Sequence, residues 1–153
     1  MSDAELLNSP LLAPLLDLWA ERLGGAVILH AAPTGRILMV AGSVEGVGAI
    51  QPLGAQVDDF IGRFQVFAQD GSVAAIDQLP VVRAMATGQP VLNEVWLLGV
   101  APAIVPVIVD TYPLHVDGQV AGVIATATDP KRWASRAEAL KLSISLRDQL
   151  APG

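Results

Sequence analysis

Apolar residues near the start of the chain recur at the spacing of a helix. Ser9-Pro10 is a typical helix start and Gly24-Gly25 a typical stop, and the apolar positions between them are Leu11, Leu12, Leu15, Leu16, Trp19 and Leu23. We therefore expect residues 1–25 to contain an N-terminal amphipathic helix. The stripe is wide, so two interpretations stay open: the helix packs on its own domain, or on a second subunit.

Two short strands and a helix are predicted next. Residues 26–32 are apolar and residues 37–41 return after the turn Pro-Thr-Gly-Arg. From Gly42 to Gly62 the pattern weakens, and we expect short helices or single turns there. A helix then begins near Pro80, with Asp77 available as a cap, and ends at Thr87-Gly88.

Three further strands complete the pattern: residues 91–98, 105–114 and 119–128. The last two are joined by Asp117-Gly118, the preferred two-residue hairpin turn because both positions need positive φ. We therefore predict an α+β domain over residues 26–130, with a five-stranded antiparallel sheet and short helices on one face. Residues 131–153 are expected to form a C-terminal helix with a short coiled-coil-like seam of Trp133, Ala137, Leu140 and Ile144.

These segments, in this order, resemble bacterial PAS domains. PTGRILMVAG is similar to their opening hairpin, DGSVAAIDQLPVVRAMATGQPVLNEVW to the segment leading into their third strand, and DTYPLHVDGQVAGVIATATD to their closing hairpin. The resemblance covers roughly residues 26–130. Ala41-Gly42 stands where such domains often carry an asparagine. The resemblance implies a sensory or dimerisation module with a cavity between the sheet and the short helices, often attached to an output domain or signalling partner.

Composition and charge exclude several classes of function. The net charge of −6 leaves no basic stripe for nucleic acid, and no apolar run is long enough to span a membrane. The absence of cysteine excludes disulfides and thiol chemistry. The first ten residues lack the basic start of a secretory signal, so we expect a cytoplasmic protein.

A homodimer is expected because the chain is unusually apolar, with 52% hydrophobic residues and a mean hydropathy of +0.51. The residues that we expect at the interface come from the two terminal helices: Leu12, Leu15, Leu16, Trp19, Trp133, Leu140 and Ile144.

A small apolar ligand in the cavity implied by the resemblance would meet a limited set of side chains. These candidates are His30, Val82, Arg83, Met85, Asn93, Trp96, Tyr112 and Thr126. Arg83 has two interpretations: turned inward it is a carboxylate clamp helped by hydroxyl groups, and turned outward it is a solvated residue paired with Glu94. Trp96 and Asn93 could flank a flavin, or be a core aromatic and a strand cap.

No resident cofactor or metal is expected. The predicted helix before the third strand lacks the histidine that haem-binding PAS domains place there, and neither His30 nor His115 has a carboxylate at metal-ligand spacing. No nucleophile elbow, phosphate-binding glycine loop or spaced carboxylate pair occurs either, so we do not expect an enzyme.

We therefore expect a sensory module that binds a small molecule, mediates homodimerisation, or does both. The alternatives are a ligand-free dimerisation or scaffold module and, in third place, a small α+β enzyme. A buried His30, or Arg83 beside a carboxylate, would favour the enzyme.

Overall fold

The computed structural model describes residues 11–44, 65–68, 70–100 and 103–130. The elements in chain order are α2 (Leu12–Leu23), β1 (Ala26–Ala31), β2 (Ile37–Gly42), β3 (Gln65–Ala68), the single-turn η1 (Ile76–Gln78), α4 (Pro80–Thr87), β4 (Val91–Val100), β5 (Ala103–Val116) and β6 (Gln119–Thr128). The expected start of the first helix at Ser9-Pro10 and the C-terminal helix lie outside the described residues.

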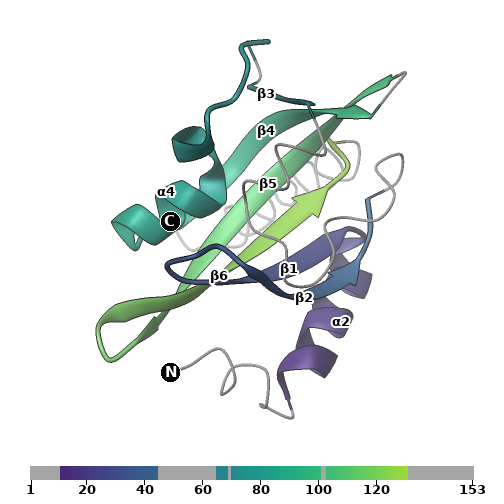
Figure 1. The fold of residues 1–153 in the computed structure, drawn as a ribbon. Coiled ribbons are helices and arrows are strands. Elements are labelled where there is room, and N and C mark those ends of the chain that lie inside the picture. Colours follow the sequence, from purple (N-terminus) through teal and green to yellow (C-terminus); the bar gives the residue numbers. More distant parts are fainter. Residues whose placement is uncertain (1–10, 45–64, 69, 101–102, 131–153) are drawn as a thin grey trace, which may run out of the picture.

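The strands form one sheet in the order β2-β1-β6-β5-β4-β3, and every neighbouring pair is antiparallel (Figure 1). Five of the six strands are those predicted, and β6 has the predicted bounds. Asp117 and Gly118 both have positive φ, 52° and 79°, as the hairpin turn requires.

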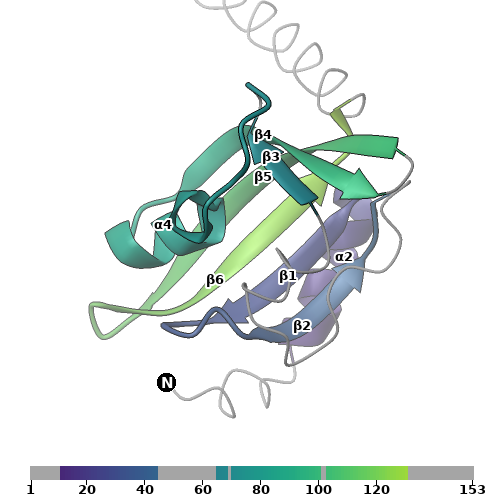
Figure 2. The ribbon, with the colours of Figure 1, turned by 45° about the horizontal axis from the view of Figure 1, so that its top comes forward.

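The prediction of five strands was wrong by one, because β3 is an additional strand. It pairs with the free edge of β4 from Gln65↔Gly99 to Ala68↔Trp96, so it lies at the end of the sheet (Figure 2). The sequence QVFA is too short to show a clear alternation of apolar and polar residues, and its pairing with β4 is what makes it a strand.

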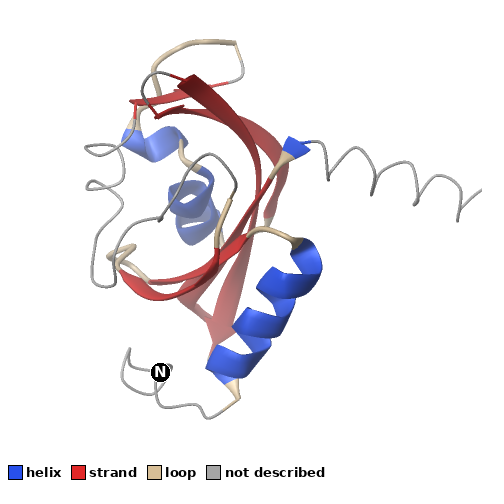
Figure 3. Ribbon diagram, turned by 90° about the vertical axis from the view of Figure 1, so that its right-hand side faces the viewer, coloured by secondary structure: helices blue, strands red, loops and turns tan. Residues whose placement is uncertain are grey.

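The two faces of the sheet carry separate cores. We call the face toward α4 the inner face and the face toward α2 the outer face; Figure 3 shows the two helices on opposite sides of the strands. The inner core contains Ala26, Ile28, Ile37, Val44, Val66, Ala74, Leu79, Trp96, Leu98 and Val107. The outer core contains Leu16, Ala20, Val27, Leu29, Ala31, Leu38, Ala41 and Ile124. Successive residues of β1 belong to different cores because side chains alternate along a strand.

Glycines end both helices as predicted. Gly24 follows α2 with φ 69°, and Gly88 follows α4 with φ 68°, each donating its N–H to a carbonyl oxygen four residues earlier. Pro80 begins α4, where its missing N–H costs nothing. The expected cap is different: Leu79 is the N-cap of α4, and Asp77 lies in η1, the turn before it.

Candidate functional site

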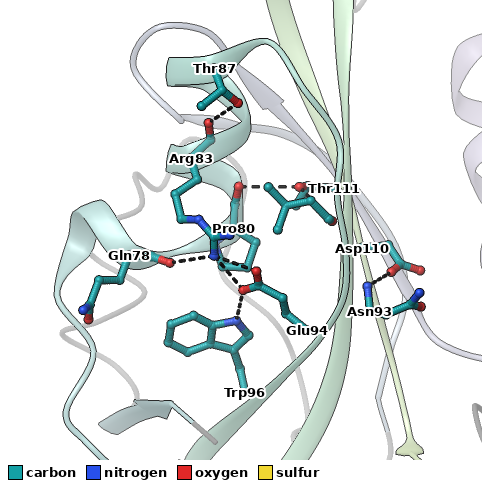
Figure 4. Close-up of polar contacts among 10 residues, drawn as sticks. Gln78, Pro80, Arg83, Thr87, Asn93, Glu94, Trp96, Asp110 and Thr111 are labelled. Atoms are coloured by element: carbon teal, nitrogen blue, oxygen red, sulfur yellow. Dashed lines mark hydrogen bonds and ion pairs between the residues drawn. The ribbon is translucent and has the colours of Figure 1, made fainter.

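A polar cluster connects α4 to the inner face of the sheet (Figure 4). The Arg83 Nη1 atom of α4 lies 2.7 Å from each carboxylate oxygen of Glu94 on β4. The Trp96 indole N–H donates to one of these oxygens over 3.1 Å, and Arg83 also donates to the carbonyl oxygen of Gln78 over 3.5 Å. Glu94 thus accepts hydrogen bonds from Arg83 on α4 and from Trp96 on its own strand.

The cluster lies at the boundary between solvent and the inner core. The side chain of Arg83 is 42% exposed and that of Glu94 is 28% exposed, whereas Trp96 is buried at 7%. Trp96 and Glu94 share the inner face because they are two residues apart on β4. Arg83 therefore turns neither fully outward nor fully inward: it is paired with Glu94 as the outward interpretation predicted, but in a half-buried position.

Polar contacts at both ends of α4 hold the helix on the sheet beside this cluster. The hydroxyl group of Thr111, which is fully buried on β5, lies 3.5 Å from the carbonyl oxygen of Pro80 in α4 and 3.3 Å from that of Val91 in β4, and its single O–H can donate to one of them at a time. At the other end of the helix, His115 contacts the carbonyl oxygen of Gly88 over 3.0 Å. His115 is exposed. The position of Arg83 over the strands is thus fixed at both ends of α4.

The remaining α4 candidates have different surroundings. Val82 packs against the inner core, and Met85 is half-buried. Thr87, one turn after Arg83, donates its hydroxyl to the Arg83 carbonyl oxygen over 2.9 Å. Val82 and Arg83 thus both lie at the inner face.

His30 is buried on β1, 7% exposed, opposite Val123 of β6. By alternation from Ile28 it lies on the inner face. Its Nδ1–H donates to the carbonyl oxygen of Gly35 over 2.8 Å, which secures the β1–β2 turn. Burial lowers the pKa of His30 below 6.5, and the bond to Gly35 opposes this only in part. His30 therefore stabilises the turn as a neutral imidazole, and no carboxylate is among its hydrogen-bond partners in the described residues.

Three of the predicted ligand residues lie away from the inner face, which corrects the sequence-based site. Tyr112 and Thr126 lie opposite Ile124 and Val27, residues of the outer core, and Tyr112 contacts Trp19 of α2 with ring centroids 5.6 Å apart. Tyr112 and Thr126 therefore lie on the outer face, because residues paired across an antiparallel ladder project to the same side of the sheet.

Asn93 is the third of these residues. Its backbone has φ 60° at a bulge between Val91 and Glu94, and its N–H donates to the buried carboxylate of Asp110 over 2.6 Å. Its side chain is drawn with Asp110 on the side of the sheet opposite Thr111 (Figure 4). Asn93 is therefore not a neighbour of Trp96, which lies three residues further along β4 and faces the opposite side of the sheet. It is not a cap at the strand start either, because β4 begins at Val91. Asp110 was not foreseen, although a lone carboxylate within an apolar strand is a visible signal.

The helix α2 divides the predicted dimerisation residues. Leu16 is buried and Leu12 and Trp19 pack against the outer core, so the helix rests on its own domain. Leu15 is 58% exposed, in line with two exposed leucines outside the predicted set, Leu11 (69%) and Leu18 (47%). The other predicted contacts, Trp133, Leu140 and Ile144, lie outside the described residues.

Within the described ranges, no group of three or more histidine or acidic side chains could hold a metal ion. No helix in this part of the chain is long and apolar enough to cross a membrane.

Comparison with solved structures gives two similar chains, and one of them is a PAS domain. The chain is similar to the PAS domain of BvgS from Bordetella pertussis, with a TM-score of 0.44 and 15% identity, over 90% of this chain and 97% of that domain. The element order of the structure, in which α4 lies between the opening hairpin β1–β2 and the three strands β4–β6, is the order predicted from the sequence. No family model and no curated protein matches the sequence.

Proposed function

We propose that the chain is a sensory module in which a small molecule, bound at the inner face of the sheet, controls the association of two copies through α2. The observation that carries the proposal is the division of α2 into two apolar faces. One face buries Leu16 and Ala20 on the sheet, and the other presents Leu11, Leu15 and Leu18 to solvent at intervals of four and three residues.

A row of exposed leucines at this spacing favours association of helices. Apolar side chains three and four residues apart form one continuous stripe, and a second copy of α2 buries it without any change in the sheet beneath. Burial of leucine side chains contributes about 25 cal/mol per Å² of apolar area, against which the loss of translational and rotational freedom must be set.

Light scattering on the whole chain tests the association. We expect a dimer mass at micromolar concentration and a monomer mass for the double variant Leu15→Lys/Leu18→Lys. The matched control is Asp17→Lys, because Asp17 is exposed on the same helix but is not part of the stripe. A monomeric wild type, or a double variant that still dimerises, would contradict the proposal.

The polar cluster of Arg83, Glu94 and Trp96 supports the second half of the proposal, ligand binding. It places a cation, a carboxylate and an indole N–H at the solvent boundary of an apolar face, and sites for small molecules combine few polar groups with apolar walls in this way. A ligand-free dimerisation module is the outcome if the protein associates but responds to no small molecule.

The pair of Arg83 and Glu94 also meets our sequence-based criterion for an enzyme, a carboxylate beside Arg83. Its contacts argue for binding instead. Arginine keeps its proton in proteins, and the other partners in the cluster, the Gln78 carbonyl and the Trp96 indole, do not transfer protons. The cluster can therefore recognise a charged group and has no general acid or base besides Glu94.

A further inference from the structure

Two N–H donors from different elements meet at one carboxylate. The Arg83 guanidinium, on α4, and the Trp96 indole, on β4, both donate to the same oxygen of Glu94, over 2.7 and 3.1 Å (Figure 4). The second oxygen of Glu94 lies 2.7 Å from the same guanidinium nitrogen. A charged donor and a neutral one that converge in this way define a place for a carboxylate group, whichever molecule carries it.

The place of this carboxylate adjoins apolar residues. Trp96 belongs to the inner core together with Leu98 and Val107, and Val81 and Val82 of α4 pack against that core. A molecule whose carboxylate lies between Arg83 and Trp96 would direct the rest of its body along apolar side chains.

Charge singles out Arg83 as the recognition group. Of the cationic side chains in the described ranges, Arg22 belongs to α2 and Arg36 to the β1–β2 turn, so Arg83 is the one that reaches the inner face from α4. An anionic ligand at this face would therefore bind Arg83.

We propose that Arg83 and Trp96 form a receptor for a small monocarboxylate with an apolar body, and that Glu94 occupies this receptor in the unliganded protein. The proposal rests on the proposed ligand-binding function and names its ligand class. Binding is an exchange of one carboxylate for another, with no covalent step and no transfer of protons.

The exposure of the pair makes the exchange feasible. An ion pair that is 42% and 28% exposed is weak because water and salt screen it, so a ligand loses little by breaking it. Glu94 is close enough to solvent for its released carboxylate to be hydrated. Removal of Glu94 should empty the receptor and raise the affinity for the ligand.

The test uses hexanoate as the probe and the full-length chain in 0.15 M salt. The indole N–H of Trp96 gives its own signal in a proton–nitrogen correlation spectrum, assigned by Trp96→Phe, and reports the hydrogen bond directly. We expect hexanoate to shift this signal and to bind Glu94→Ala about two- to fivefold more tightly than the wild type, the gain that loss of a weak, exposed ion pair allows. Glu94→Gln keeps a hydrogen-bond acceptor for Trp96 but removes the negative charge that pairs with Arg83. Its affinity for hexanoate should therefore lie between the affinities of the wild type and of Glu94→Ala.

Two controls separate the carboxylate from the apolar body. Hexanamide should bind Glu94→Ala at least tenfold more weakly than hexanoate, and so should acetate. Arg83→Met in the Glu94→Ala background should abolish the hexanoate response while the rest of the spectrum shows a folded protein.

Two results would overturn the receptor: a folded Glu94→Ala whose Trp96 signal does not respond to hexanoate, or equal affinities with and without Arg83. Equal affinities for acetate and hexanoate would contradict the claim that the ligand has an apolar body. The proposed function is tested separately, because light scattering with and without hexanoate reports whether ligand binding changes the association of two copies. Binding without such a response keeps the receptor and refutes the coupling.

Discussion

Leu15 and Leu16 are neighbours on α2 with opposite surroundings, and their replacement by alanine separates folding from association. Leu16 is 3% exposed within the outer core, whereas Leu15 is 58% exposed. The two substitutions remove the same atoms from the same helix. Any difference between them therefore comes from what each side chain contacts.

The cost of Leu16→Ala follows from its burial. Replacement of a buried leucine by alanine costs about 2–5 kcal/mol, through lost transfer free energy and the cavity left behind. Because α2 lies on the surface of the sheet and can settle toward it, we expect about 2–4 kcal/mol. In a domain of this size that corresponds to a fall in Tm of roughly 5–15 °C.

Leu15→Ala should change the free energy of unfolding of the monomer by no more than about 0.5 kcal/mol, since exposed positions rarely cost more and alanine favours the helix. Its effect should appear in association. Burial of the exposed part of a leucine contributes about 1–2 kcal/mol, and a symmetric dimer contains two copies, so the dissociation constant should rise by at least about tenfold.

Urea denaturation at a protein concentration below the dissociation constant of the dimer measures the change in monomer stability. Sedimentation equilibrium measures the change in the dissociation constant. The assignment of the two faces of α2 would be refuted if Leu15→Ala destabilised the monomer as much as Leu16→Ala. An unchanged dissociation constant in Leu15→Ala would refute the role of the leucine stripe in association.

Substitutions at three other positions test the fold. Gly118→Val should lower the free energy of unfolding by about 1–2 kcal/mol, because the backbone at Gly118 has φ 79°, and not because of crowding, since no atom lies within 4 Å of a Cβ there. Gly118→Asn should cost less, because asparagine tolerates this φ. Equal costs of the two substitutions in thermal unfolding would contradict the conformational explanation. Gly25→Ala should cost about 1–3 kcal/mol in the same assay because its Cβ would collide with the carbonyl oxygen of Ala127, and an unchanged Tm would count against that close approach. The pKa of His30 is lowered in the folded state, so its contribution to the free energy of unfolding is complete above pH 6.5 and is lost as the pH falls below 6.5, by up to about 1.4 kcal/mol per pH unit. His30→Gln should make the free energy of unfolding, measured by urea titration between pH 7.5 and 5.5, depend less on pH. An equal pH dependence in the variant and the wild type would exclude His30 as its source.

Local sequence patterns predicted the elements well where a turn or a stop marks each end. Strand β6 lies between the Asp117-Gly118 turn and Asp129-Pro130, and its predicted bounds are confirmed. The helix α4 likewise lies between Pro80 and Gly88. In contrast, β3 has no such marks, and it is defined by a partner strand some thirty residues later in the chain.

The candidate site was harder to predict because alternation shows which residues of a strand share a face, and not which face is inner. Thr111 and Tyr112 are adjacent and equally plausible as ligand contacts, yet only Thr111 faces α4. Asn93 adds a second difficulty, because the bulge beside it interrupts the period of two, and nothing in the local sequence marks a bulge. The width of the leucine stripe on α2 was visible, but which leucines it buries depends on the sheet.

The two proposed sites lie on opposite faces of the sheet, and the hairpin of β4 and β5 is the element that reaches both. Glu94 contacts Arg83 on the inner face, while the preceding residue, Asn93, donates its N–H to Asp110 on the outer face. Two residues beyond Asp110, Tyr112 contacts Trp19 of α2. If a ligand displaces Glu94 as proposed, the contact of Asn93 with Asp110 offers a route from Glu94 toward Tyr112, which contacts α2.

Continuity of this kind is necessary for coupling and does not set its size. A ligand shifts association only by the ratio of its affinities for the monomer and the dimer, so a tenfold preference changes the dissociation constant by no more than tenfold for each bound molecule. Because linkage is reciprocal, the dimer must also bind hexanoate more tightly or more weakly than the monomer by the same factor. Affinities measured at two protein concentrations therefore determine the coupling independently of the light-scattering result, and linkage requires the two values to agree whichever element transmits the signal.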